Sequence, residues 1–159
     1  MRYIRKMDRI KYVQGAPYAN AMQWNTNATN ADLVALVVYA ARRARPFVTV
    51  PGFVTRSAAP ETVHAFARDR VRYVLEDGDQ LVRMPWRTVA DGVADCKSMA
   101  VLCATLCAAA GCKTVLRFVR YRGEDHYAHV YAVADGVPVD PELPEGAEVS
   151  YADCVDFAL

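Results

Sequence analysis

The sequence predicts a domain of the α+β class, and three local patterns carry that prediction. The almost entirely apolar segment 95–110, which ends at Gly111, is typical of a buried helix. Residues 113–121 and 126–133 alternate polar and apolar side chains, which indicates strands. Asp135-Gly136 then separates two apolar runs and is the strongest β-hairpin signal in the chain. We therefore expect a central helix packed on a small antiparallel sheet.

Length and composition are those of one globular domain. The chain has 159 residues, 53% hydrophobic and 23% charged, which excludes wholesale disorder and a fibrous architecture. The longest apolar runs, 33–41 and 99–110, are too short for a membrane span of ~20 residues, and no apolar signal-peptide core is visible. We expect a cytoplasmic protein without a membrane partner. An odd count of five cysteines favours reduced thiols over a disulfide framework.

Charge is unevenly distributed along the chain. Residues 1–12 hold five basic side chains against Asp8 alone, and no Lys or Arg follows Arg122. Two interpretations stay open: a basic arm that docks on an acidic protein or a nucleic acid, and a solvated segment that packs against the acidic tail. We favour the second and expect no nucleic acid partner, while a protein partner bound through the arm or the tail stays open.

The N-terminal third is expected to serve the core rather than to form it. We assign residues 1–56 to an arm and helix that pack on or dock for the core, and residues 57–159 to the core with its acidic C-terminal tail. Turn formers over residues 1–29 indicate an extended, partly strand-like arm. A helix is expected from residue 31 to 45 with Asn30 as its cap, followed by a short strand or extended connector.

The middle of the chain predicts a second helix and a loop. Apolar residues recur at spacings of three and four from Pro60 to about Glu76. His64 falls on a polar stripe of this helix, so we expect it at the surface and outside any site. Residues 79–92 are expected to form a loop that delivers the chain to the central helix. Trp86 in this loop is a candidate substrate-binding residue, and its placement in the core is an alternative of equal weight.

Cys96 occupies the first turn of the central helix, a position that favours nucleophilic chemistry. Asp95 can cap the helix by accepting hydrogen bonds from its free N–H groups, and the positive end of the helix dipole favours thiolate over thiol. We expect Cys103, Cys107 and Cys112 to fill the core, because free cysteine is mostly buried and structural zinc ligands rarely have this spacing. No metal and no cofactor is expected.

The hairpin indicates which histidine can serve Cys96. With a two-residue turn, Tyr131 faces Asp140, so His129 lies diagonal to Asp140 on the same face of the sheet. His126 points to the opposite face. A thiol nucleophile needs a base that a carboxylate orients, and the hairpin supplies this pair as His129 and Asp140. A three-residue turn with a bulge would reverse the assignment.

Three stretches of the chain carry a family resemblance. They are Asp91-Gly92-Val93-Ala94-Asp95-Cys96-Lys97-Ser98, His129-Val130-Tyr131-Ala132-Val133 and Val137-Pro138-Val139-Asp140-Pro141. In this order they resemble the transglutaminase-like superfamily of cysteine peptidases. The resemblance spans about residues 60–143. It implies a papain-like α+β fold with Cys96, His129 and Asp140 as a catalytic triad.

The chain also departs from that family. The family often has glycine at the place of Ala94 and tryptophan at those of Tyr131 and Val137, so its substrate preference does not carry over. Papain-like enzymes often keep a glutamine where this chain has Ala90, so the backbone N–H of Cys96 would supply most of an oxyanion hole. The small size resembles stand-alone transglutaminase-like proteins of tailed phages and prophages, which implies a virion or its assembly as an alternative location.

These observations predict cysteine-dependent acyl transfer to or from a peptide or protein substrate. Cys96 attacks an amide carbonyl, His129 moves the proton, and Asp140 orients His129. Hydrolysis of a peptide or isopeptide bond is favoured over cross-linking because the sequence shows no acyl-acceptor pocket. Tyr131 joins Trp86 as a candidate substrate-binding residue. Two alternatives stay open: an idle transglutaminase-like module with a structural or assembly role, for instance in a phage virion, and acetyl transfer from a small thioester.

Overall fold

The computed structural model describes residues 21–24, 29–75 and 80–159. The predicted basic segment, residues 1–12, lies outside the described residues. Within the described part of the chain, helices and a mainly antiparallel arrangement of strands make a mixed α+β fold, as predicted.

The largest sheet is antiparallel and has the strand order β7-β6-β5-β8. Its two central strands are β5 (Thr114–Arg120) and β6 (His129–Ala134), and its edges are β7 (Val137–Val139) and β8 (Asp153–Ala158). The first central strand falls within the segment whose alternation predicted it, and the second ends one residue beyond its predicted segment. The second begins three residues later than expected, which leaves a longer loop before it.

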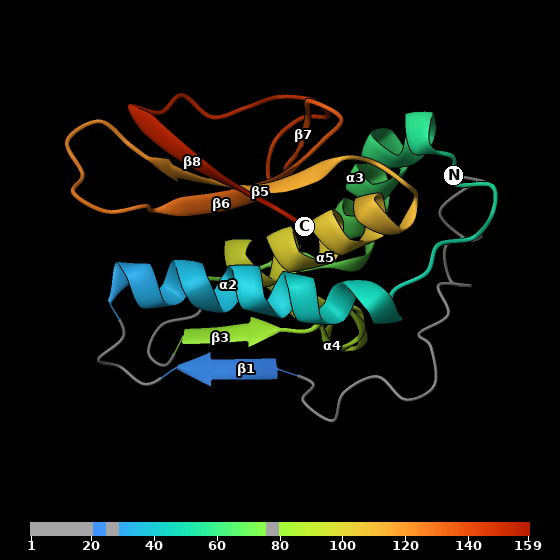
Figure 1. The fold of residues 1–159 in the computed structure, drawn as a ribbon, viewed down its shortest axis with the longest axis horizontal. Coiled ribbons are helices and arrows are strands. Elements are labelled where there is room, and N and C mark those ends of the chain that lie inside the picture. Colours follow the sequence, from blue (N-terminus) through green and yellow to red (C-terminus); the bar gives the residue numbers. More distant parts are fainter. Residues whose placement is uncertain (1–20, 25–28, 76–79) are drawn as a thin grey trace.

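Helices cover one face of this sheet. Figure 1 shows α2 (Asn30–Ala44) and α5 (Cys96–Ala109) between the sheet and the pair β1 (Ala21–Trp24) and β3 (Gln80–Arg83), while α3 (Ala59–Arg70) packs against α5 and β7. Side chains of α2, α3, α5 and the inner face of the sheet form one large apolar cluster. In the described ranges, no helix combines the length and the apolar character needed to cross a bilayer.

The central helix α5 has the predicted extent. It runs from Cys96 to Ala109, and Gly111 follows it with a φ of +91°, a left-handed conformation that favours glycine. Every residue from Ser98 to Cys107 is buried, which explains why the segment has no polar face. Cys103, Cys107 and the nearby Cys112 are core residues, as predicted.

The start of α2 differs by one residue from the prediction. Thr29, not Asn30, is the N-cap, and it forms a capping box in which its hydroxyl accepts from the backbone of Asp32 at 3.2 Å while that carboxylate accepts from the Thr29 backbone at 2.9 Å. After α2, the chain forms a short 3-10 helix, Arg45–Phe47, and then an extended connector.

The second predicted helix is shorter than expected. α3 ends at Arg70 instead of continuing to residue 76, because the backbone turns extended at Val71 (φ −127°). The next residues form β2 (Arg72–Tyr73), which pairs in parallel with β4 (Val93–Ala94). Sheet pairing thus ends the helix where β-branched and aromatic residues begin to dominate.

The segment predicted as the loop 79–92 contains regular structure, so that prediction was wrong. It holds β3, antiparallel to β1, and the short helix α4 (Pro85–Asp91). Pro85 stands at the start of α4, and Gly92 closes it with a φ of +65°. At seven residues, α4 is too short to show a helical period in the sequence.

The hairpin between β6 and β7 has the predicted two-residue turn. Asp135 and Gly136 have φ values of 49° and 84°, so both turn residues are left-handed, and Ala134 faces Val137 across the turn. The Asp135 carboxylate also accepts two hydrogen bonds from Arg56, each 2.6 Å long. The register that the site prediction needs is therefore present.

The acidic tail contributes a strand that the sequence analysis did not predict. β8 pairs along its whole length with β5. Phe157 of β8 packs edge-on against Phe118, with 5.7 Å between ring centroids. The carbonyl of Ala158 accepts two hydrogen bonds from Arg42 of α2, at 2.9 and 3.1 Å. The tail is thus part of the folded core.

Candidate active site

Cys96 is the first residue of α5. The chain reaches it directly from β4, which is fixed by its pairing with β2. Asp95 caps the helix as predicted, because its carboxylate accepts from the backbone of Ser98 at 3.2 Å. The same carboxylate, 2% exposed as a residue, forms an ion pair with Lys97. Cys96 itself is only half-buried and so can be reached from solvent. Its own N–H belongs to the first helical turn, which has no acceptor within the helix.

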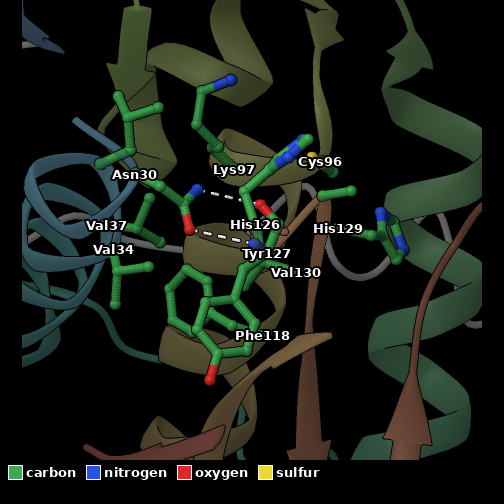
Figure 2. A pocket seen from close by; sticks show the side chains of 12 residues that line it. Asn30, Val34, Val37, Cys96, Lys97, Phe118, His126, Tyr127, His129 and Val130 are labelled. Atoms are coloured by element: carbon green, nitrogen blue, oxygen red, sulfur yellow. Dashed lines mark hydrogen bonds between the residues drawn. The ribbon is translucent and has the colours of Figure 1, made fainter. Parts of the chain in front are cut away.

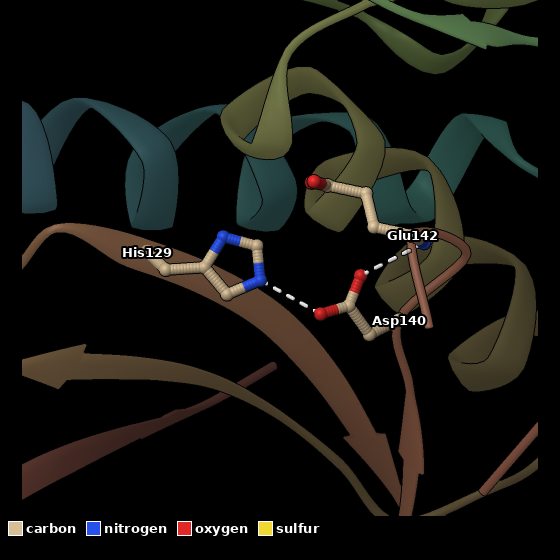
Figure 3. A group of neighbouring side chains, drawn as sticks. All are labelled: His129, Asp140 and Glu142. Atoms are coloured by element: carbon tan, nitrogen blue, oxygen red, sulfur yellow. Dashed lines mark hydrogen bonds and ion pairs between the residues drawn. The ribbon is translucent and has the colours of Figure 1, made fainter. Parts of the chain in front are cut away.

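His129 and Asp140 are in direct contact, as the hairpin register predicts. His129 opens β6, and Asp140 follows the last residue of β7. Figure 3 shows the bond between them, in which His129 Nε2 lies 2.7 Å from Asp140 Oδ2. The two side chains are 10% and 3% exposed. A short bond between buried groups fixes the imidazole ring and leaves Nδ1 for another partner.

Cys96 lies beside the imidazole. Cys96 and His129 line the same pocket, and the thiol is near enough to His129 to affect the pKa of its ring. Burial acts to lower the pKa of His129, but the hydrogen bond with Asp140, the neighbouring Cys96 and the negative charges of both groups outweigh burial and raise the pKa to about 10. The structure therefore brings the three predicted residues together and favours the imidazolium form of the histidine at neutral pH.

The loop after Asp140 is held by a histidine expected at the surface. His64 of α3 is 5% exposed, and its Nε2 lies 2.8 Å from the carbonyl oxygen of Leu143. Arg68 donates to the same oxygen at 3.0 Å. The surface prediction for His64 was wrong because a chain segment distant in sequence covers this side of α3. His64 stays outside the catalytic group and positions the loop that carries Asp140.

Glu142 lies beside the pair of His129 and Asp140. Figure 3 shows its side chain over them, and its backbone N–H donates to Asp140 Oδ1 at 3.1 Å. Partial burial raises the pKa of Glu142 against the opposing effect of His129. One donor atom from each of these three residues lies within 4.8 Å of the others, so the group could hold a metal ion. Such an ion would bind the His129 nitrogen and the Asp140 carboxylate, and so would break the hydrogen bond between them.

A pocket of about 290 Å³ opens beside the cysteine. Cys96, Lys97 and His129 line it together with side chains from the first half of α2, from β5 and from the segment before β6. Figure 2 shows Asn30 of α2 joined to the backbone of Tyr127 at this pocket. The amide donates to the carbonyl of Tyr127 at 3.0 Å and accepts from its N–H at 2.9 Å. This double contact holds the chain two residues before His129.

The two predicted substrate-binding residues occupy different surroundings. Tyr131 is 1% exposed, its hydroxyl donates to Glu148 at 2.5 Å, and its ring centroid lies 5.7 Å from that of His129. It therefore supports the imidazole from inside the protein and offers no surface to a substrate. Trp86 is half-buried on α4 and is not among the residues that line the pocket beside Cys96.

The other candidate histidine, His126, lies away from Asp140. His126 lies in the loop before β6, not in a strand, and interacts with Asp125 at 3.0 Å instead of Asp140.

Three polar residues near the site were not predicted from the sequence. They are Asn30, which bonds the backbone of Tyr127, and the tyrosines Tyr73 and Tyr121. Burial, followed by the nearby negative charges of the site, raises the pKa of both tyrosines. No local pattern marks these three residues, because their partners are distant in sequence.

No family model, curated protein or solved structure matches this chain. The geometry of the site alone therefore carries the functional argument.

Proposed function

We propose that this protein is a cysteine-nucleophile enzyme that hydrolyses a peptide or isopeptide bond. One observation carries the proposal: His129 is bonded through Nε2 to buried Asp140 and lies beside Cys96, the first residue of the central helix. A nucleophile, a base and a residue that orients the base are the parts that covalent acyl transfer requires.

The proposed reaction uses each of these groups in turn. Cys96 Sγ attacks the amide carbonyl, the C–N bond breaks, and His129 gives its proton to the leaving amine. Water then attacks the thioester and gives a proton to His129, which releases the carboxylic acid and restores the Cys96 thiolate beside the His129 imidazolium. The first-turn N–H of Cys96 is the donor available for the negative oxygen of each tetrahedral intermediate. Asp140 holds the ring and stabilises the imidazolium.

We further propose that the fold is of the transglutaminase-like, papain-like type. Three features support this assignment: the cysteine opens the central helix, the histidine opens a strand while the aspartate directly follows the neighbouring antiparallel strand, and the chain order is Cys96, His129, Asp140. The assignment by itself selects neither hydrolysis nor cross-linking. Hydrolysis is preferred because water needs no second binding site.

The test is cleavage of a mixture of peptides, with and without isopeptide bonds, followed by mass spectrometry. We expect Cys96→Ala to abolish cleavage, because no other group replaces the thiolate. Cys154→Ala is the matched control, since Cys154 is also a free, half-buried cysteine but lies on β8. Equal cleavage by the wild type and Cys96→Ala would refute the proposal. So would an iodoacetamide reaction that modifies Cys154 faster than Cys96 at pH 6.

The alternative is an idle module of the same fold in a structural or assembly role, including a place in a phage virion. It predicts slow alkylation of Cys96 and no cleavage by the wild type. A slow Cys96 in a folded protein would therefore favour the alternative over the enzyme.

A further inference from the structure

Much of the wall of the pocket beside Cys96 is apolar. Leu33, Val34 and Val37 of α2 face Phe118 of β5 and Val130 of β6 across it. Figure 2 shows that Val34, Val37 and Phe118 point toward the same space. Val37, Phe118 and Val130 are buried, whereas Leu33 and Val34 are half-buried. The pocket thus joins the apolar core to the surface.

The polar groups of this pocket already have partners within the protein. The side chain of Asn30 is engaged with the Tyr127 backbone through both its oxygen and its nitrogen. Lys97 is paired with Asp95, and His126 with the acidic residues before it. A ligand group without charge or hydrogen-bonding atoms leaves these pairs intact and packs on the apolar side chains of the wall.

We propose that this pocket binds an uncharged apolar side chain of the peptide substrate, close in sequence to the carbonyl that Cys96 attacks. The inference rests on the proposed function, because Cys96 and His129 form part of the same wall and place the occupant next to the reacting atoms. The volume of about 290 Å³ suits one branched aliphatic or aromatic side chain. In apolar pockets, one methylene group changes kcat/KM by roughly 10–200-fold.

The first experiment uses covalent probes that do not require turnover. Acetyl-leucyl, phenylalanyl, aspartyl and lysyl chloromethyl ketones are compared with iodoacetamide, which carries no side chain. In each ketone reaction the Cys96 thiolate displaces chloride from the methylene carbon and a thioether forms. Mass spectrometry of the modified Cys96 gives the rates. We expect the leucyl and phenylalanyl ketones to react about tenfold or more faster than the lysyl and aspartyl ketones.

The second experiment fills the pocket. Leu33→Trp adds bulk at a half-buried wall position, so the rate with the leucyl and phenylalanyl ketones, divided by that with iodoacetamide, should fall about tenfold. Ala35→Trp adds the same side chain at an exposed position of the same helix that does not line this pocket, and should leave the ratio unchanged. Circular dichroism establishes that each variant is folded. Leu33→Ala gives a second test, because a larger pocket should favour the phenylalanyl over the leucyl ketone.

The outcomes separate this inference from the proposed function. Fast iodoacetamide alkylation of Cys96 with equal rates for all four ketones would overturn the pocket assignment and leave the enzyme proposal standing. Slow alkylation by every probe would overturn the enzyme proposal itself. A ratio that falls equally in Leu33→Trp and Ala35→Trp would also contradict the pocket assignment.

Discussion

Among single residues, Asp140 does most to raise the pKa of His129, the proposed general acid. Its carboxylate, 3% exposed, bonds Nε2 of His129 and contributes to the high pKa of that ring. Below its pKa the imidazolium carries the proton that the leaving amine needs, and above it that proton is lost. A raised pKa therefore extends activity toward alkaline pH.

Removing the charge of Asp140 should narrow this pH range. We expect the alkaline limb of kcat/KM near pH 10 in the wild type, since the pKa of His129 is about 10. In Asp140→Asn the hydrogen-bond geometry can persist without the charge, so the limb should move down by roughly one to three pH units. Initial rates from pH 6 to 11 measure the shift.

Asp125→Asn is the matched control for that experiment. Asp125 is fully exposed and bonds His126 at 3.0 Å, so it is the other aspartate next to a histidine. Its substitution should leave the alkaline limb in place. An unmoved limb in Asp140→Asn, or an equal shift in both variants, would contradict the assigned role of Asp140.

Prediction at the residue scale was successful where the governing geometry is local. The turn between β6 and β7 fixes the faces of a strand pair, and this was enough to bring His129 and not His126 to Asp140. His64 was misplaced because its surroundings depend on the Leu143 carbonyl, which lies 79 residues further along the chain. The spacing of apolar residues along α3 cannot show that a distant segment covers His64.

At the scale of elements, Asn30 joins α2 to the segment that leads into β6. It bonds both backbone groups of Tyr127, as a neighbouring strand would. We expect Asn30→Ala to lower the free energy of unfolding by about 1–3 kcal/mol through the loss of two hydrogen bonds. Amide hydrogen exchange at Tyr127 should become faster. Urea denaturation and exchange mass spectrometry measure the two effects.

Thr29→Ala provides the control on the same turn of α2. It removes the N-cap and should cost about 1 kcal/mol, but it should leave exchange at Tyr127 unchanged. If both variants accelerate exchange at Tyr127 equally, Asn30 does not hold the Tyr127 backbone in the way proposed.

The same two residues show why one helix start was misassigned. Thr29 and Asn30 are both good caps, so local preference does not choose between them. The choice depends on Tyr127, which lies 97 residues from Asn30 and occupies its side chain. By contrast, Asp95 and Gly111 enclose α5 without competitors, and its bounds were correctly predicted. The short elements β3 and α4 lacked a measurable period and were missed.

At the scale of the whole molecule, β8 forms one edge of the sheet and is hydrogen-bonded to α2. Phe157 packs on Phe118 in the main apolar cluster. We expect Phe157→Ala to lower the free energy of unfolding by about 2–4 kcal/mol, below the cost at a fully buried position because Phe157 is half-buried. Urea denaturation is the measurement.

Val137→Ala on the opposite edge strand is the comparison. Val137 is 40% exposed, so its substitution should change stability by at most about 0.5 kcal/mol. Equal effects of the two substitutions would show that β8 is not part of the cooperative fold. The sequence did not predict β8, because its alternation is short and acidic and its pairing with β5 is between distant segments.

The turn at Asp135-Gly136 gives the site an unusual dependence on chain length. Side chains alternate between the faces of a strand, so one residue added to this turn would rotate every later side chain of β7 to the other face. Asp140 would then point away from His129, although each residue of the triad would still be present in the sequence. We therefore expect a one-residue insertion in this turn to be as harmful to the chemistry as replacing Asp140 itself.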